Sequence, residues 1–500
     1  MSLKLNVVWL KRDLRWSDHA PLAQAVALGE PVVGILLHEP SLWSQPVYSP
    51  RHARFEAESF DDLAANRPQL GPDRIPFPIF YVKSEAVEAL EALRAAADLP
   101  LGRIFSHEEV GIEVSFARDR QVKQWCAEQG ISWVESPYGS VRRGLRRRTD
   151  WNAHWNEVMF REPQAEPEWS RGTAWIPTAE WTEWAAQREV PRPEREAGVA
   201  QTGGPTWGHR YLRSFLEGGR GRGYMAHISK PEGARTHCSR LSPYLAWGNL
   251  SLKQVVRALS TTQGAQILPA RDARAFASRL RWREHFIQKF ESECRMEFEH
   301  VNRGYDRQEF SPNSAHLEAW KTGNTGVPMV DACMRSLNAT GYLNFRMRAM
   351  LVSYGCHVLN LHWKDLSAHL AQQFLDFEPG IHYPQLQMQA AVTGVNTVRI
   401  YNPVKQAEEQ DPQGAFLAQW IPELAVLPMP FRAAPWTLTE LDGVAFGFAR
   451  GTDYPEPLVD LKKALSEARV RLYGAKKRPE VRAEKARILE THVAPGRRFS

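Results

Sequence analysis

Cysteine is scarce in this 500-residue sequence and follows no metal-binding spacing. The five cysteines are scattered, no two form a Cys-x-x-Cys pair, and the last is Cys356. This odd, dispersed set is typical of a reducing cytoplasm and argues against disulfides or a zinc ribbon, so no metal is expected. No run of 18 apolar residues and no apolar signal region are present either, so we expect a cytoplasmic protein without a membrane span.

The remaining composition is that of a globular protein long enough for two or three domains. Hydrophobic residues make up 43% and charged residues 24%. The net charge of +6 and the pI of about 9.0 permit a polyanionic partner without requiring one. Tryptophan is unusual: 18 copies would fill cores, or would serve a protein that stacks on bases or moves electrons.

The first part of the chain alternates short apolar runs with helical patterns around 21–29, 86–97 and 115–130. The strand-like runs are Val7–Leu10, Val32–Leu37, Ile79–Val82, Arg103–Ser106 and Ile131–Val134. Buried strands separated by helices predict an α/β domain with a Rossmann-like parallel sheet over residues 1–137. No G-x-G-x-x-G follows the first run, so no dinucleotide is expected there.

The pattern changes after residue 137. Residues 138–205 are rich in tryptophan and proline with weak periodicity, which predicts an interdomain connector over the surface. Its arginine run, 142–148, is interpreted as a solvated face rather than a DNA site. Residues 206–473 show helical patterns and no convincing strand, which predicts an all-α domain. Residues 474–500 are basic and are expected to fray.

One stretch, 323–363, combines two amphipathic helices with embedded charge. Apolar residues recur at helical spacing from Val327 to Leu337, the pattern breaks at 338–341, and a second helix is expected to run to Leu361. Arg346 and Arg348 begin that second helix beside its apolar stripe. A buried arginine needs an anion or a carboxylate, so the alternatives are a structural ion pair and a ligand site.

The same stretch resembles the signature of the photolyase/cryptochrome family, G-x-P-x-V-D-A-x-M-R-x-L-x-x-T-G-W-x-H-N-R-x-R-M. Tyr342, Asn344 and Phe345 stand where the family has Trp, His and Asn. The segment Trp9–Arg15 with Asp18 resembles the family's opening motif. The matching residues are Gly326, Pro328, Val330, Asp331, Ala332, Met334, Arg335, Leu337, Thr340, Gly341, Arg346, Arg348 and Met350.

This resemblance implies a helical domain that encloses FAD. The segment Cys238–Ser251 is nearly the family's pyrophosphate-gripping pattern, although serines before a proline are more often a simple helix cap. Arg283 of the W-R-E motif would help to hold the flavin. Asp376 would form an ion pair with Arg348 at the flavin edge, although a buried ion pair between two helices is also a common structural device. The other cofactor residues implied are Tyr224, Ser239, Arg240, Leu241, Ser242 and Glu378.

The resemblance also suggests how damaged DNA would be held. Trp282 would pack against the lesion, and Asn344 and Phe345 lie in the family's lesion pocket. Arg279 stands where enzymes that repair cyclobutane dimers carry Glu, but its guanidinium can donate to thymine carbonyls. Trp363 matches the middle tryptophan of the family's electron relay, Tyr305 falls near the outer position, and no tryptophan matches the inner one.

The function implied is blue-light-driven repair of cyclobutane pyrimidine dimers by reduced FAD, in a monomer that binds UV-damaged DNA. One alternative is a cryptochrome-type photoreceptor. Another is repair of the (6-4) photoproduct, which Asn344 at the pocket His position disfavours, with His382 as a distant candidate acid. An antenna pigment of unknown identity is implied for the N-terminal domain. An iron–sulfur cluster is not, because no cysteine follows Cys356.

Overall fold

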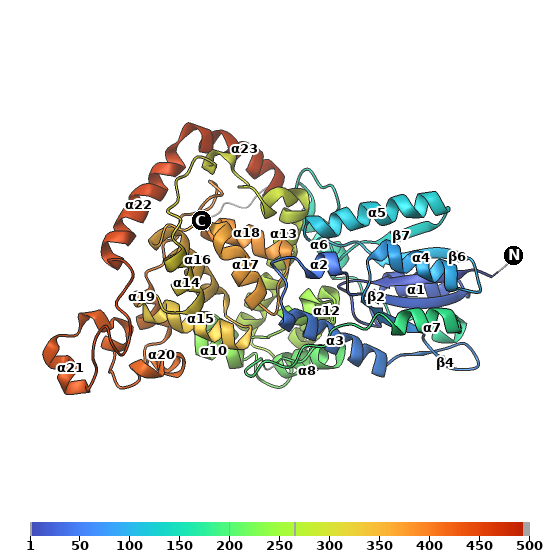
Figure 1. Ribbon diagram of the computed structural model, residues 1–500, viewed down its shortest axis with the longest axis horizontal. Helices are drawn as coiled ribbons and strands as arrows, with labels where there is room; N and C mark the ends of the chain where they lie inside the picture. The colour runs from blue at the N-terminus through green and yellow to red at the C-terminus, as the bar shows by residue number, and fades with distance from the viewer. Residues whose placement is uncertain (1–2, 200, 265–266, 494–500) are drawn as a thin grey trace.

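The computed structural model describes residues 3–199, 201–264 and 267–493. An α/β part and a helical part lie side by side along the long axis of the molecule (Figure 1). This arrangement confirms the predicted fold class. Within the described ranges no helix is both long and apolar enough to cross a membrane.

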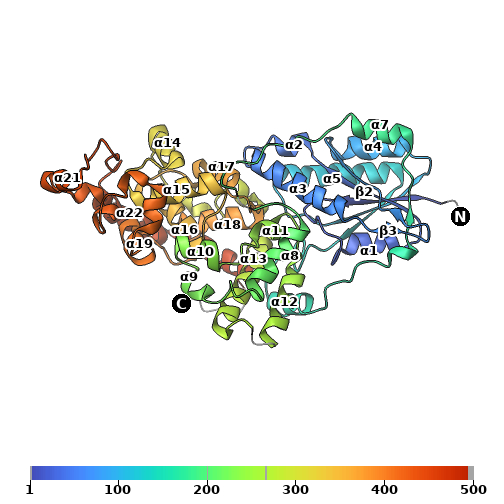
Figure 2. The same ribbon diagram turned by 90° about the horizontal axis from the view of Figure 1, so that it is seen from below.

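All five predicted strands are confirmed, and they form one parallel sheet. Helices cover both faces of the sheet (Figure 2), so β1 and β2 are buried along their whole length. The strand order is β5 (Ile79–Val82), β2 (Pro31–Leu37), β1 (Leu5–Leu10), β6 (Leu101–His107) and β7 (Ser132–Ser136). One face packs on α1 (Ala20–Ala27) and α3 (Pro50–Ala65), the other on α4 (Ala86–Ala96) and α5 (Glu113–Gln129).

The predicted connector is more integrated than its weak periodicity indicated. β8 (Thr173–Ala174) adds to the sheet beside β2, and α7 (Ala179–Ala186) packs on it through the buried Trp181. α6 (Trp151–Met159) instead packs into the helical part. The interpretation of the arginine run as solvated is wrong for Arg148, which is buried with its Nη1 atom 3.0 Å from His285 Nδ1.

Beyond Pro205 the described residues form helices and no strand, as predicted. The expected second helix of the central pair ends early: α16 stops at Ser353, a π-helical turn covers Tyr354–Val358, and Leu361 lies outside it. The helices that matter below are α8 (Pro205–Leu216), α9 (Tyr224–His227), α10 (Pro231–His237), α11 (Ser242–Ala246), α12 (Leu252–Gly264), α13 (Ala270–Ser292), α15 (Pro328–Thr340), α16 (Phe345–Ser353), α17 (Trp363–Gln373) and α18 (Pro379–Gln389). The others are α2 (Pro40–Trp43), α14 (Ser314–Thr322), α19 (Pro403–Gln410), α20 (Ala415–Trp420) and α21 (Glu440–Phe446), with a small hairpin of β3 (Gln69–Leu70) and β4 (Ile75–Pro76).

The C-terminal segment does not fray as expected. α22 (Leu461–Lys477) and α23 (Pro479–His492) form an arch over the helical part (Figure 1). Val481 and Ile488, seven residues apart on one face of α23, are fully buried. Burial of this apolar face holds the helix in place despite its many charges; residues 494–500 of the predicted tail lie outside the described residues.

Asp331 of the central signature has a structural role. Its carboxylate accepts hydrogen bonds from the backbone N–H groups of Thr325 (2.8 Å) and Gly326 (3.0 Å) and from the Tyr454 hydroxyl. Gly326 has φ +76°, and a side chain there would collide with the carbonyl oxygen of Glu456. The turn before α15 is therefore fastened to the C-terminal region through one buried carboxylate.

Replacing Tyr454 with Phe tests this fastening. Tyr454→Phe leaves one lone pair of the buried Asp331 carboxylate without its donor, so we expect a loss of about 1–3 kcal/mol in the free energy of unfolding, measured by denaturant titration. Tyr473→Phe, on the exposed side of α22, is the matched control and should change it by less than about 0.5 kcal/mol. Equal effects of the two substitutions would contradict this role.

Candidate functional site

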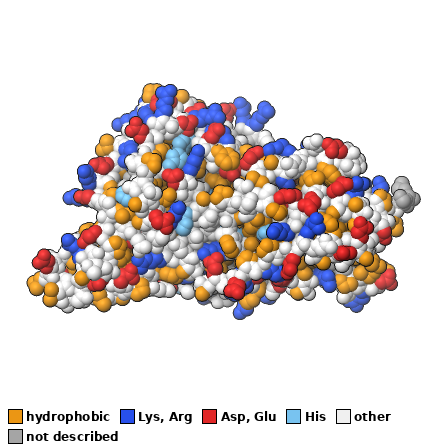
Figure 3. Space-filling view, in the orientation of Figure 1, with side chains coloured by type: hydrophobic (Ala, Val, Ile, Leu, Met, Phe, Trp, Pro, Cys, Tyr) orange, Lys and Arg blue, Asp and Glu red, His pale blue; other side chains and the backbone are white. Residues whose placement is uncertain are grey.

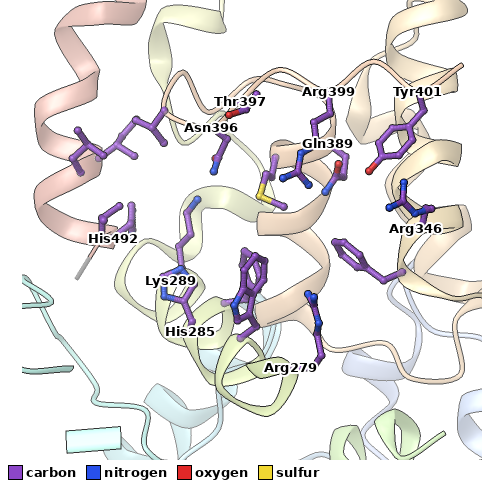
Figure 4. Close-up of a pocket in the computed structure, with 18 of the residues that line it drawn as sticks. Arg279, His285, Lys289, Arg346, Gln389, Asn396, Thr397, Arg399, Tyr401 and His492 are labelled. Atoms are coloured by element: carbon purple, nitrogen blue, oxygen red, sulfur yellow. The ribbon is translucent and has the colours of Figure 1, made fainter. Parts of the chain in front are cut away.

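A cavity of about 330 Å³ opens in the helical part, between α13, α16, α18, the loop 395–401 and α23. Figure 4 shows Arg279, His285 and Lys289 reaching it from α13, Arg346 from α16, and His492 from α23. In the space-filling view, basic side chains follow the outer edge of α22 and α23 (Figure 3). Segments far apart in the sequence thus supply the walls of this cavity.

The cavity is cationic and aromatic. None of the described residues that line it is Asp or Glu. Its cations are Arg279, Lys289, Arg346 and Arg399, and its aromatic rings are Trp282, Phe286, Phe345 and Tyr401. A concave surface with this excess of positive charge attracts a polyanion, and its rings can stack on a flat partner.

Helix α13 presents Arg279, Trp282 and Phe286 to the cavity because residues three and four apart share a helix face. The Trp282 and Phe286 rings meet edge to face with centroids 5.9 Å apart, and the Arg279 guanidinium lies 5.3 Å from the Trp282 ring centre. Arg283, the next residue after Trp282, instead turns toward the start of α18. Apolar residues on the opposite side of α13 enter the core and fix this orientation.

Two arginine–carboxylate pairs lie at the start of α18. Arg348 donates to both oxygens of Asp376 at 3.0 Å each, and Arg283 donates to Glu378 at 2.9 Å. Burial acts to raise the pKa of Asp376, but the Arg348 charge and a hydrogen bond from Ser242 hold it below its usual value. Asp376 is therefore ionised, and it links three separate segments of the chain.

The turn that contains Ser239 and Ser242 lies among arginines. Arg220 donates to the Ser239 carbonyl at 2.9 Å, and burial followed by repulsion from Arg240 lowers the pKa of Arg220. Burial and Arg240 also lower the pKa of Arg235. Ser242, in the same turn, is exposed. Mutually repelling cations around one turn make it suited to bind an anion.

The backbone of this turn is strained. Arg240 has φ +58°, a conformation that costs a non-glycine residue energy. Its guanidinium is held 3.7 Å from the Tyr342 ring centre and bonds Gln201 Oε1 at 2.8 Å. Tyr342, one departure from the family signature, thus supports the arginine. These contacts of Arg240 hold the strained turn in one conformation, and they thereby fix the positions of Ser239 and Ser242.

The structure disperses the other predicted site residues. Tyr224 and Leu241 are buried in the helical core, and Asn344 donates to the Ile228 carbonyl at 3.0 Å, while only Phe345 of the predicted lesion pair faces the cavity. Trp363 is fully buried at the start of α17 and does not line the cavity; its relay role stays a prediction. Tyr305 is also buried, with 1% of its surface exposed, which does not suit an outer relay position.

Sequence reasoning missed the walls supplied by the loop 395–401 and by α23, including His492. It also missed His285, which lines the cavity. His382, the distant candidate acid, lies on α18 away from the cavity and is hydrogen-bonded to Ser367; burial lowers the pKa of His382 to about 4. The spacing of Val481 and Ile488 was a signal for α23. No local signal placed it beside α13, because that contact joins segments almost 200 residues apart.

Two family models match the chain: DNA photolyase over residues 6–141, and the FAD binding domain of DNA photolyase over residues 276–473. Together they cover more than half of the sequence. The chain belongs to the photolyase/cryptochrome family. Its helical part is the family's FAD-binding domain, in agreement with the predicted cofactor.

Photolyases and cryptochromes both occur among the similar proteins. A cryptochrome DASH of Natronomonas pharaonis is 27% identical over 91% of this chain and 98% of its own length. A deoxyribodipyrimidine photo-lyase of Vibrio cholerae is 28% identical over 95% and 100%. The solved class III photolyase of Agrobacterium tumefaciens has a TM-score of 0.80 at 22% identity, covering 96% of this chain and 99% of its own, which supports the fold alone.

Replacing Asp376 with Asn tests whether the α18 pairs serve the photolyase-type cofactor site. Asp376→Asn removes the charge that balances Arg348, and we expect about 10- to 100-fold weaker FAD binding, since a hydrogen bond to a charged group contributes about 1.5–3 kcal/mol. The measurement is the flavin-to-protein absorbance ratio after dilution and gel filtration. Glu423→Gln, which breaks the Arg335–Glu423 pair away from the cavity, should keep wild-type flavin content. Unchanged flavin content in Asp376→Asn would remove this pair from the cofactor site.

Proposed function

We propose that this protein repairs cyclobutane pyrimidine dimers in DNA under blue light. When bound and reduced, FAD supplies the electron that opens the cyclobutane ring and then takes it back. The observation that carries the proposal is the cavity itself, which joins four cations and four aromatic rings and has no carboxylate among its described lining residues. Damaged DNA offers the matching phosphates and exposed bases.

We propose that the cofactor is held by the residues around α18 and the Ser239–Ser242 turn. The arginines near the turn would balance the pyrophosphate charge, and the Ser242 hydroxyl would keep its hydrogen bond to Asp376. Arg348 and Arg283 would keep the adjoining wall polar while Asp376 and Glu378 balance their charges. The fit rests on the half-buried arginines around this turn, which repel one another.

The lesion would be held mainly by α13. A dimer must leave the duplex to reach the cavity, which costs a few kcal/mol and least for a damaged, poorly stacked pair. Trp282 offers an apolar face worth about 1–3 kcal/mol per stacked base. Arg279 would donate to the thymine carbonyl oxygens and stabilise negative charge that develops there. Phe345, opposite, forms an apolar wall.

A photoreceptor is the second candidate, and one observation favours it. Helix α23 forms part of the cavity wall through Ile488, Leu489 and His492. A structural change inside the cavity can therefore shift α23, and a partner protein could bind to this helix in one of its positions. Cryptochromes among the relatives are consistent with this alternative.

Repair and binding assays on the FAD-loaded, reduced protein test the first proposal. Trp282→Ala and Arg279→Ala should each weaken binding to an oligonucleotide that carries a cyclobutane dimer by about 10-fold, and binding to undamaged DNA much less, because stacking and carbonyl contacts are lost. Arg274→Ala, exposed on α13 outside the cavity, is the matched control for charge.

Wild-type protein that neither binds nor repairs the dimer under blue light would overturn the proposal and favour the photoreceptor. Repair of a (6-4) oligonucleotide in place of the dimer would reassign the lesion and direct attention to His285 and His492, the histidines in the cavity wall.

Binding to damaged DNA should also depend on pH through Lys289. Burial, followed by repulsion from Arg148, lowers the pKa of Lys289 to about 8, with partial compensation by Glu293. Phosphates prefer the protonated amine, so the affinity should fall as pH rises above 8, by up to about tenfold per unit. Lys289→Arg keeps its charge and should flatten this profile in fluorescence-anisotropy titrations. A wild-type profile that is already flat from pH 7 to 9 would exclude Lys289 from DNA binding.

A further inference from the structure

A shallow groove of about 430 Å³ lies in the C-terminal region, between the start of α19, a turn at 434–437 and the first half of α22. Helices α19 and α22 lie side by side at the end of the molecule away from the α/β part (Figures 1 and 2). The groove and the cavity have no lining residue in common. It is therefore a second, separate hollow of the helical part.

The groove carries positive charge without a carboxylate. Lys462 and Arg469 line it and are exposed, and none of its described lining residues is Asp or Glu. Neither side chain has a hydrogen bond or an ion pair with another described residue. Asp460, the nearest acid in the sequence, instead accepts from the backbone N–H of Lys463 at 2.9 Å and caps α22. Both cations of the groove are thus available to an anionic partner.

The cationic face of α22 continues from the groove toward the cavity. Residues on it recur at steps of three and four, so they share one side of the helix, and Glu467, the only acid of α22, falls on another side. At the far end of this face Lys476 Nζ donates to the Asn396 carbonyl oxygen at 2.9 Å, and Asn396 lines the cavity. The face consists of Lys462, Ser466, Arg469, Tyr473 and Lys476.

The chain segment 395–402 connects the two hollows in the same way. Most of its residues up to Tyr401 line the cavity, and Asn402 lines the groove. Arg469 and Lys462 precede Lys476 by two and four helical turns, which places them about 10 and 21 Å from it along the axis. Successive phosphates of one strand of B-DNA are about 3.4 Å apart along the axis, so the groove lies about three to six phosphates from the cavity rim.

Trp436 adds a flat apolar surface to the groove. Its side chain is half-buried and borders the groove, and its carbonyl oxygen accepts from Arg450 Nη1 at 3.1 Å, which holds the turn. Cations beside an aromatic ring are the combination that binds a nucleic-acid strand, because the cations pair with phosphates and the ring stacks on a base. An acidic peptide would need the cations alone, so the ring favours nucleic acid.

We propose that this groove binds one strand of the DNA that flanks the lesion, an inference that rests on the proposed function because it places the lesion in the cavity. Phosphates about three to six nucleotides from the lesion would pair with Lys462 and Arg469, and a base would stack on Trp436. The groove would then add to the affinity for long substrates and not for short ones.

Fluorescence-anisotropy titrations of the FAD-loaded protein with labelled single strands of two lengths test the groove. A dimer flanked by roughly eight nucleotides on each side should bind more tightly than a dimer flanked by a single nucleotide, because only the longer strand reaches the groove. Lys462→Ala and Arg469→Ala should each weaken binding of the longer strand by about 3- to 10-fold and reduce its salt slope by about 0.7, without effect on the shorter strand.

Two further variants complete the test. Lys463→Ala, which removes the same charge from the next exposed residue of α22 outside the groove, is the matched control and should change neither quantity. Trp436→Ala should weaken binding of the longer strand by about tenfold, whereas Trp436→Phe keeps a ring and should retain most of the affinity. Circular dichroism and flavin content establish that each variant is folded.

An undamaged long strand separates this proposal from the repair function. If wild-type protein shows no preference for the dimer but Lys462→Ala and Arg469→Ala still weaken binding of the undamaged strand, the groove is upheld and the repair function fails. Equal affinities of wild type, Lys462→Ala and Arg469→Ala for the long strands, or an equal loss in Lys463→Ala, would overturn the groove. Binding of polyglutamate in place of DNA would also overturn it and assign the groove to an acidic protein.

Discussion

The centre of this structure depends on one constraint: a charged side chain is buried there only together with a side chain of opposite charge. Glu378 balances Arg283 of α13, and its charge also stabilises that of Arg12, which reaches over from the α/β domain. One carboxylate at the start of α18 therefore serves both domains. Asp376, two residues earlier, balances the charge of Arg348 of α16. Because removal of one partner leaves an uncompensated buried charge, these pairs fix the relative positions of the elements that enclose the site.

Two places near these pairs carry positive charge without full compensation, and both are functional candidates for that reason. The arginines around the Ser239–Ser242 turn repel one another, and the cavity beside α13 has no carboxylate among its described lining residues. A protein tolerates such excess charge where an anion binds. The two regions suit the two anions expected in this family, the pyrophosphate of FAD and the backbone of DNA.

The C-terminal helices connect stability with function. Helix α23 forms a wall of the cavity, and His492 at its end pairs with Glu293 just beyond α13 at 2.6 Å. Tyr454, earlier in the same region, holds the turn that begins α15. The C-terminal region is thus part of the framework around the cavity, and changes there should reach the cavity through α23 and α13.

The sequence by itself determined the elements and the family, because both depend on local patterns: the five apolar runs became the strands of the sheet, and the motifs around Arg283, Arg348 and Asp376 became paired charges. The same local reading predicted a frayed tail and a solvated Arg148, and both predictions were wrong because neighbours distant in the sequence bury these segments. Only the tertiary structure placed α23 against α13, turned Arg283 away from Trp282, and brought Lys476 of α22 to Asn396. Contacts between distant segments arise from the packing of whole elements, and no short pattern in the chain encodes them.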